Sequence, residues 1–342
     1  MRCRLSIQNK ITMKRSVFIV SLLMMMQMLC MPCQAQRRIP SLGLALCGGG
    51  AKAAAEVGVL KSLDNLGVKP SYIAGSSMGA FVGGLYAAGY TGEEIEAMWL
   101  DESWIKLFCE NAVGSGKPID NSDVERTIFG LVDGDAFEAR LREKLRAKHC
   151  ERFEDLRGVK FCCTATEVVD NLTLREEDIS TGDMAKAIRA SLSYPVPLIG
   201  FSPVYINGKQ LVDGGMLNNL PVDVVKRMGA SHVITVDLEM KQKTVASILQ
   251  IGLLFLYDTN SKFKLLAKYT RTEWLLRWVR NGKAIQQRHD DNWNMSYVKI
   301  KPMQLVDFNI LSFNRDAIRR MVREGRRAMD DMHYKVEDLI GL

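Results

Sequence analysis

Histidine is scarce in this chain of 342 residues. The four histidines lie outside any recognisable motif; they are His149, His232, His289 and His333. His232 lies within an apolar, strand-like run and is expected to be a core residue. The sequence therefore offers few side chains that would change charge between pH 5 and 8 in a polar loop.

Cysteine patterns, repeats and low-complexity tracts are also missing. We find no repeated CxxC and no internal repeat at solenoid periods. With 47% hydrophobic and 25% charged residues, the composition is that of an ordinary globular protein with a large core. After residue 35 the cysteines are odd in number, and we expect buried free thiols, with one disulfide still possible in an oxidising compartment; they are Cys47, Cys109, Cys150, Cys162 and Cys163.

The longest N-terminal apolar run, residues 17–31, is too short for a membrane span of about 20 residues. Basic residues precede it and small residues follow it near Ala35, which is the pattern of a secretory signal peptide. We therefore expect export, to the periplasm or outside the cell, after cleavage near Ala35. An uncleaved N-terminal anchor is the alternative, and Met13 is an alternative start.

Positive charge is concentrated in that same N-terminal segment. The formal net charge is +7, and five of the positive charges belong to Arg2, Arg4, Lys10, Lys14 and Arg15. Without them the chain is nearly neutral, so we expect no nucleic-acid partner.

The rest of the chain alternates short apolar strands with helices. Strand-like runs at 42–47 and 70–75 each lead through a turn into a helix, which is typical of a parallel sheet with helices on its faces. Thr91 and Glu94 form a capping box for a helix expected to run to about residue 107. We predict an α/β domain core over 36–240, and a helical region with a late strand over 241–342 that packs on or continues it.

A candidate nucleophile lies between the second strand and its helix. Gly75-Ser76-Ser77-Met78-Gly79 matches G-x-S-x-G in the strand–turn–helix context that this motif requires. The sharp turn forces Ser77 into a crowded backbone conformation, and Gly75 and Gly79 leave room for it. A plain flexible turn is the alternative.

The first strand ends in a glycine run that could supply backbone donors. Gly48, Gly49, Gly50 and Ala51 stand at a helix N-terminus, where N–H groups can bind an oxyanion. A nucleotide-binding loop is not favoured, because no G-x-x-x-x-G-K-[ST] is present and Ala53 replaces the third glycine of a dinucleotide site.

The best candidate for a base is Asp213, in LVDGGMLNNLPVDVV. It follows a short apolar strand, and Gly214 and Gly215 permit a tight turn that leaves its carboxylate uncrowded. A carboxylate in a partly apolar site has a raised pKa and is a stronger base. An ordinary Asp-Gly turn is the alternative, as is a Ser–His–Asp arrangement, in which the acid normally precedes the histidine.

Taken together, CGGGAKA, GSSMG and DGG resemble the patatin-like phospholipase family in order and spacing. The resemblance implies a three-layer α/β/α fold with a mostly parallel sheet, and hydrolysis of lipid acyl esters without metal or cofactor. It implies a Ser77–Asp213 dyad, with the Gly48–Ala51 backbone as oxyanion hole. Ala53 departs from the family's usual glycine and is harmless if that position is helical.

Two further expectations concern partners. A catalytically silent protein that binds lipids or acyl groups is the alternative to an enzyme of this fold. The basic and aromatic stretch 262–280, with Trp274 and Trp278 on one helical face, suits a lipid interface, although such helices usually pack on their own core.

Overall fold

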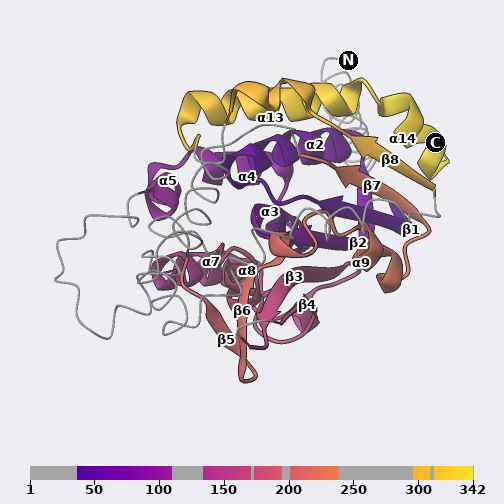
Figure 1. Cartoon of the computed structure of the whole chain (residues 1–342). Coiled ribbons are helices and arrows are strands. Elements are labelled where there is room, and N and C mark those ends of the chain that lie inside the picture. The colour runs from indigo at the N-terminus through magenta and orange to yellow at the C-terminus, as the bar shows by residue number, and fades with distance from the viewer. Residues whose placement is uncertain are drawn as a thin grey trace, which may run out of the picture. The chain divides into compact units, whose positions relative to one another are not determined.

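A single eight-stranded sheet forms the centre of the part of the chain that the computed structural model describes (Figure 1). The described residues are 37–109, 134–170, 173–194, 201–238, 296–308 and 312–341. The expected signal peptide and the stretch 262–280 lie outside them.

The strands follow one another in the order β5-β6-β3-β2-β1-β7-β8, with β4 pairing to β3. Their bounds are β1 (Arg37–Leu46), β2 (Val68–Ser76), β3 (Lys160–Val168), β4 (Leu174–Ile179), β5 (Val204–Ile206), β6 (Lys209–Asp213), β7 (His232–Val236) and β8 (Ser296–Ile300). The pairs β1–β7, β7–β8 and β2–β3 are parallel, whereas β4, β5 and β6 form antiparallel pairs. The predicted mostly parallel sheet is confirmed.

Helices flank this sheet. Their bounds are α2 (Ala54–Asn65), α3 (Met78–Ala87), α4 (Gly92–Leu100), α5 (Glu102–Cys109), α7 (Asp135–Ala147), α8 (Met184–Ser191), α9 (Val222–Met228), α13 (Arg315–Asp330) and α14 (His333–Ile340). Short 3-10 turns are η1 (Gly50–Ala53), η3 (Phe153–Asp155), η4 (Gly214–Met216) and η5 (Met303–Asp307).

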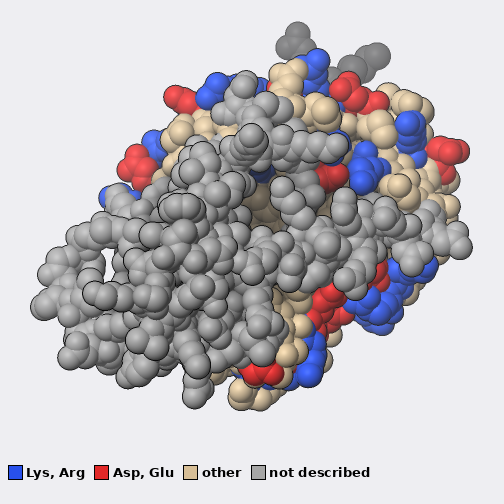
Figure 2. Space-filling model, viewed as in Figure 1, with Lys and Arg blue, Asp and Glu red and all other residues tan. Residues whose placement is uncertain are grey.

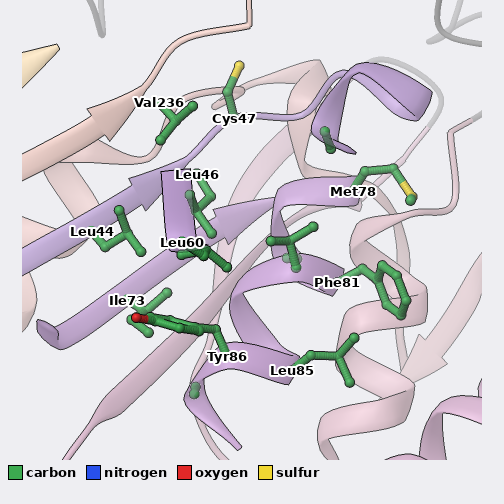
Figure 3. Packing of buried hydrophobic residues seen from close by; sticks show 14 of the residues in the cluster. Leu44, Leu46, Cys47, Leu60, Ile73, Met78, Phe81, Leu85, Tyr86 and Val236 are labelled. Atoms are coloured by element: carbon green, nitrogen blue, oxygen red, sulfur yellow. The ribbon is translucent and has the colours of Figure 1, made fainter. Parts of the chain in front are cut away.

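The alternation of side chains along β1 shows that helices cover both faces of the sheet. Leu46 faces Gly83 of α3, whereas a side chain at Gly43 would run into Val225 of α9. Because successive strand residues point to opposite faces, α3 and α9 lie on opposite sides. Figure 3 shows Leu44 and Leu46 of β1 with Ile73 of β2 and helix side chains in this core, where they are fully or almost fully buried.

The helix expected to run from Thr91 to about 107 is two helices, so that prediction was wrong. The capping box of Thr91 and Glu94 is present and begins α4. At Asp101, however, the backbone is extended (ψ 123°), and its carboxylate accepts the N–H of Ser103 at 2.8 Å. Asp101 thereby caps α5, an ordinary use of Asp at a helix start.

The late strand and the helix after it belong to the same sheet architecture. β8 continues the sheet beside β7, in register from His232↔Ser296 to Val236↔Ile300. α13 packs along α2, as the two adjacent ribbons in Figure 1 show.

On the face drawn in Figure 2, acidic and basic side chains are interspersed over the described surface. In the described part of the chain, ion pairs include Lys209–Glu177 and Arg227–Asp178. Among the described residues, every helix is too short or too polar to cross a membrane.

Candidate active site

The turn between β2 and α3 holds Ser77 in a strained backbone conformation. Its φ is +51° and its ψ −128°, a region that side-chain-bearing residues rarely occupy. A methyl group at Gly79 would lie 2.6 Å from the Leu46 carbonyl oxygen, and one at Gly75 would overlap the start of α3. The two flanking glycines are therefore required by close backbone packing, as the sequence predicted.

Strand β3 brings together Ser77 and Asp213, which are 136 positions apart in the sequence. Thr164 pairs with Ser76 in the parallel ladder, and the next residue, Ala165, pairs with Asp213 in an antiparallel one. Neighbouring positions of one strand therefore place the last residue of β2 and the last residue of β6 at the same end of the sheet. Ser77 is the residue that follows Ser76 in the chain.

The side chains of Ser77 and Asp213 are hydrogen-bonded. The Ser77 Oγ donates to Oδ2 of Asp213 at 2.6 Å, and the N–H of Gly215 donates to Oδ1 at 2.7 Å. Asp213 is only 2% exposed. Burial raises the pKa of Asp213 to about 7, although the hydrogen bonds from Ser77 and Gly215 oppose the shift. The carboxylate is thus poised to exchange a proton near neutral pH.

The glycines after Asp213 lie in tight surroundings. A methyl group at Gly214 would overlap the Thr164 carbonyl oxygen, and one at Gly215 would lie 2.5 Å from the Asn219 side chain and 3.0 Å from Asp213 Oδ1. Neither position therefore has room for a side chain without a shift of its neighbours.

The predicted oxyanion loop needs one correction. The N–H of Gly48 donates to the Asn219 carbonyl at 3.1 Å, so this donor is already used. For Gly49, Gly50 and Ala51, we find no acceptor of the backbone N–H within the described ranges. These three groups stand at the start of the helix formed by η1 and α2, where the helix dipole favours negative charge.

Ala53, the residue that departs from the usual glycine, is helical, with φ −62° and ψ −11°. It is fully buried and needs no left-handed conformation. The expectation that alanine is harmless at this helical position is confirmed as far as the backbone conformation is concerned.

Asn219 ties the glycine loop to the Asp213 loop, a role that the sequence did not reveal. Its Nδ2 donates to the Gly48 carbonyl and to the Cys47 Sγ, each at 3.2 Å, while its own carbonyl accepts from Gly48. Only the position of Asn219, six residues after Asp213, could have indicated it.

His232 lies away from the serine. His232 begins β7, at the opposite end of that strand from the edge where β1 leads into the glycine loop. Five residues of strand separate the two edges by roughly 15 Å. His149 and His333 are exposed, and His232 is half-buried rather than a core residue as expected. His289 lies outside the described residues.

The part of the chain that the structure describes has no cluster of three or more His, Cys, Asp or Glu side chains suited to a metal ion. Cys150, Cys162 and Cys163 are buried free thiols, as expected for them, and Cys47 is buried with its Sγ accepting a hydrogen bond from Asn219. Cys109 lies at the end of α5.

A strained serine hydrogen-bonded to a buried carboxylate, at the edge of an α/β sheet and beside free amides, defines a candidate serine-hydrolase site. The family model for patatin-like phospholipase matches residues 44–226, just over half of the chain. The chain belongs to the patatin-like phospholipase family.

Curated relatives resemble this chain over the same region. Lysophospholipase NTE1 of Candida albicans is 32% identical over 205 residues, or 58% of this chain and 13% of that protein. Patatin-like phospholipase domain-containing protein 7 of Mus musculus is 31% identical over 209 residues, 60% of this chain and 14% of that protein. The chain thus spans about one-seventh of their length.

Among solved structures, human GIVD cytosolic phospholipase A2 aligns over 88% of this chain and 60% of its own, with 11% identity and a TM-score of 0.45.

Proposed function

We propose that this protein hydrolyses carboxylic esters of lipids, as a phospholipase A or a lysophospholipase does, with Ser77 as nucleophile and Asp213 as general base. The observation that supports it most is the 2.6 Å hydrogen bond from the Ser77 hydroxyl to a buried carboxylate whose pKa is raised to about 7.

In the first step, Asp213 takes the Ser77 proton as the Ser77 oxygen attacks the ester carbonyl. The N–H groups of Gly49, Gly50 and Ala51 stabilise the negative oxygen of the tetrahedral intermediate, each such donor being worth roughly 3 kcal/mol. The carbon–oxygen ester bond breaks, and the leaving alcohol or lysolipid takes the proton from Asp213. An acyl group remains on Ser77.

In the second step, Asp213 removes a proton from water, and the water oxygen attacks the acyl-enzyme carbonyl. The same amides hold the second oxyanion. The bond to Ser77 breaks, and Ser77 recovers the proton from Asp213 as the fatty acid leaves. Both steps use the same two side chains, so no third titrating group is required.

A lipid substrate is part of the proposal because of the family and of the names of its relatives, which include lysophospholipases. The silent lipid- or acyl-binding alternative drew on Ala53 and on the uncertain C-terminal region. The helical backbone at Ala53 weakens the first of these two arguments.

A fluorophosphonate probe tests the proposal, because it reacts with activated serines. We expect labelling of the folded wild-type chain and none of Ser77→Ala. Release of fatty acid from phospholipids, lysophospholipids and triglycerides should follow the same pattern. A folded wild-type chain that is neither labelled nor active on any of these lipids would support the silent binding protein instead.

Asp213→Asn separates the dyad from a histidine-based triad. The dyad predicts loss of turnover in this variant, whereas a Ser–His–Asp site would keep turnover and lose it in one of the histidine-to-alanine variants. A suitable control is His333→Ala, since His333 is exposed on α14.

Export after cleavage near Ala35 is also proposed, on the sequence pattern alone. N-terminal sequencing of the protein recovered from a bacterial periplasm tests it: an intact Met1 or Met13 would contradict cleavage. Contact of 262–280 with lipid surfaces is tested by vesicle flotation of the Trp274→Ala, Trp278→Ala double variant.

A further inference from the structure

The C-terminal end of α8 contacts the nucleophile directly. The N–H of Ser77 donates to the Oγ of Ser191 at 2.8 Å, and Ser191 is fully buried. This backbone N–H belongs to the residue whose φ is +51°. A side-chain oxygen from an element 114 positions away thus satisfies a donor in the most strained part of the elbow.

The same short segment also contacts the partner carboxylate's backbone. Two residues after Ser191, the carbonyl of Ser193 accepts the N–H of Asp213 at 3.0 Å. The hydroxyl of Ser193 is turned elsewhere, toward the carbonyl oxygens of Arg189 and Ser202 at 3.0 and 2.9 Å. Residues 191–193 therefore hold both members of the proposed dyad, one through a side chain and the other through the main chain.

We propose that Ser191 is a positioning residue that fixes the Ser77 backbone so that its hydroxyl meets Asp213. Strained backbone conformations persist only where their surroundings hold them. The Ser77 carbonyl is already fixed by the N–H of Ala80 at 2.8 Å, so the Ser191 contact fixes the other side of the same residue. Without it, the turn can relax and the Ser77 Oγ moves relative to the carboxylate. The positioning role itself does not depend on the proposed function. Only the expected effect on the reaction rate of Ser77 rests on that function.

Ser191→Ala tests the role, and Ser193→Ala is its matched control. Both variants remove a hydroxyl from a fully buried serine of one segment. Only the first removes a contact to the dyad, because Ser193 keeps its main-chain bond to Asp213. Two measurements apply: hydrogen exchange of the Ser77 amide by NMR, and the rate of fluorophosphonate labelling at a temperature where both variants are folded.

In Ser191→Ala we expect the Ser77 amide to exchange roughly tenfold faster, because it loses its acceptor. The maximal labelling rate should fall by about ten- to a hundredfold, with half-saturating probe concentration unchanged, since small misplacements of a reacting group have effects of that size. In Ser193→Ala both quantities should stay within about threefold of wild type. This should hold even if the melting temperature of Ser193→Ala falls as much as that of Ser191→Ala.

Two results would overturn the inference: unchanged Ser77 exchange in Ser191→Ala, or equal losses of labelling rate in both variants. A wild-type chain that is not labelled at all would contradict the proposed function instead, and the exchange measurement would still decide whether Ser191 holds Ser77.

Discussion

The raised pKa of Asp213 has two opposing effects on its use as a base. Its burial raises its pKa to about 7, which strengthens it as a base but leaves it protonated in acid. Only the ionised carboxylate can take the Ser77 proton. We therefore expect kcat/KM for a small ester to rise about tenfold per pH unit up to about pH 7 and to level off above it. A flat profile between pH 5 and 8 would exclude Asp213 as the base.

The same shift predicts a pH-dependent loss of stability. The folded chain keeps the Asp213 proton up to about pH 7, whereas the unfolded chain loses it near the ordinary value of 3.8. Between these values the folded state binds more protons, so the contribution of Asp213 to the free energy of unfolding decreases as pH rises. Asp213→Asn cannot ionise. We expect the variant to be more stable than wild type at pH 8, by on the order of 4 kcal/mol.

Urea unfolding at pH 4 and pH 8 measures this difference. At pH 4 the two proteins should be nearly equal, because wild-type Asp213 is neutral there in the folded state. Equal stability at pH 8 would show that Asp213 ionises in the folded protein at no cost.

At the residue scale, the sequence identified the reactive groups but not the groups that hold them. Ser77 and Asp213 are flanked by glycines at fixed offsets, so their local patterns were visible. Ser191 and Asn219 act through contacts across 114 and 171 positions, and their neighbours in sequence give no sign of it. The Gly48 donor was misassigned for the same reason, since its acceptor belongs to Asn219.

Among the elements, α2 and α13 approach each other unusually closely. A methyl group at Gly325 would overlap the carbonyl oxygen of Ala55, and one at Gly58 would lie 2.6 Å from the N of Arg326. Backbone atoms cannot move aside as a flexible side chain does. Gly325→Ala should therefore lower the free energy of unfolding by about 1–3 kcal/mol, despite the better helix propensity of alanine, as seen in a thermal melt.

Arg323→Ala is the control for this prediction. Arg323 is exposed on the same helix, two residues away, and its replacement should change stability by no more than about 0.5 kcal/mol. If Gly325→Ala were as stable as this control, the two helices would not need their close contact.

Elements with strong local signals were predicted well, and those decided by long-range contacts were not. The βα units at 42–66 and 70–88 have clear periodicity and glycine stops, and both are present. The break between α4 and α5 was missed because residues 92–107 remain helix-compatible, and a single capping side chain at Asp101 decides it. Strands β4 and β5 were not foreseen; β4 is largely charged and partly exposed, so it lacks an apolar pattern.

For the whole molecule, the sequence predicted a domain core over 36–240 and, over 241–342, a helical region with a late strand that packs on or continues it. In the described part of that second region, β8 extends the central sheet beside β7, and the main chain of Asp237 donates to the Ile300 carbonyl at 2.9 Å. Residue spacing along the chain cannot reveal that a strand 60 positions later adds to the same sheet.

A chain ending at residue 240 should therefore fail to fold as a soluble monomer. It loses β8, which leaves the edge of β7 unpaired, and it loses the buried side chains by which α13 covers α2: Ala317, Ile318, Met321, Val322 and Met329. An exposed strand edge beside an uncovered apolar helix face favours aggregation. A chain ending at Asp331 is the matched comparison, because it removes only α14 and keeps both β8 and α13. We expect that chain to elute as a monomer in size-exclusion chromatography and the shorter one to be insoluble or aggregated. Were the shorter chain monomeric, with a comparable melting temperature, the C-terminal strand and helix would be additions to a complete domain rather than parts of its sheet and core.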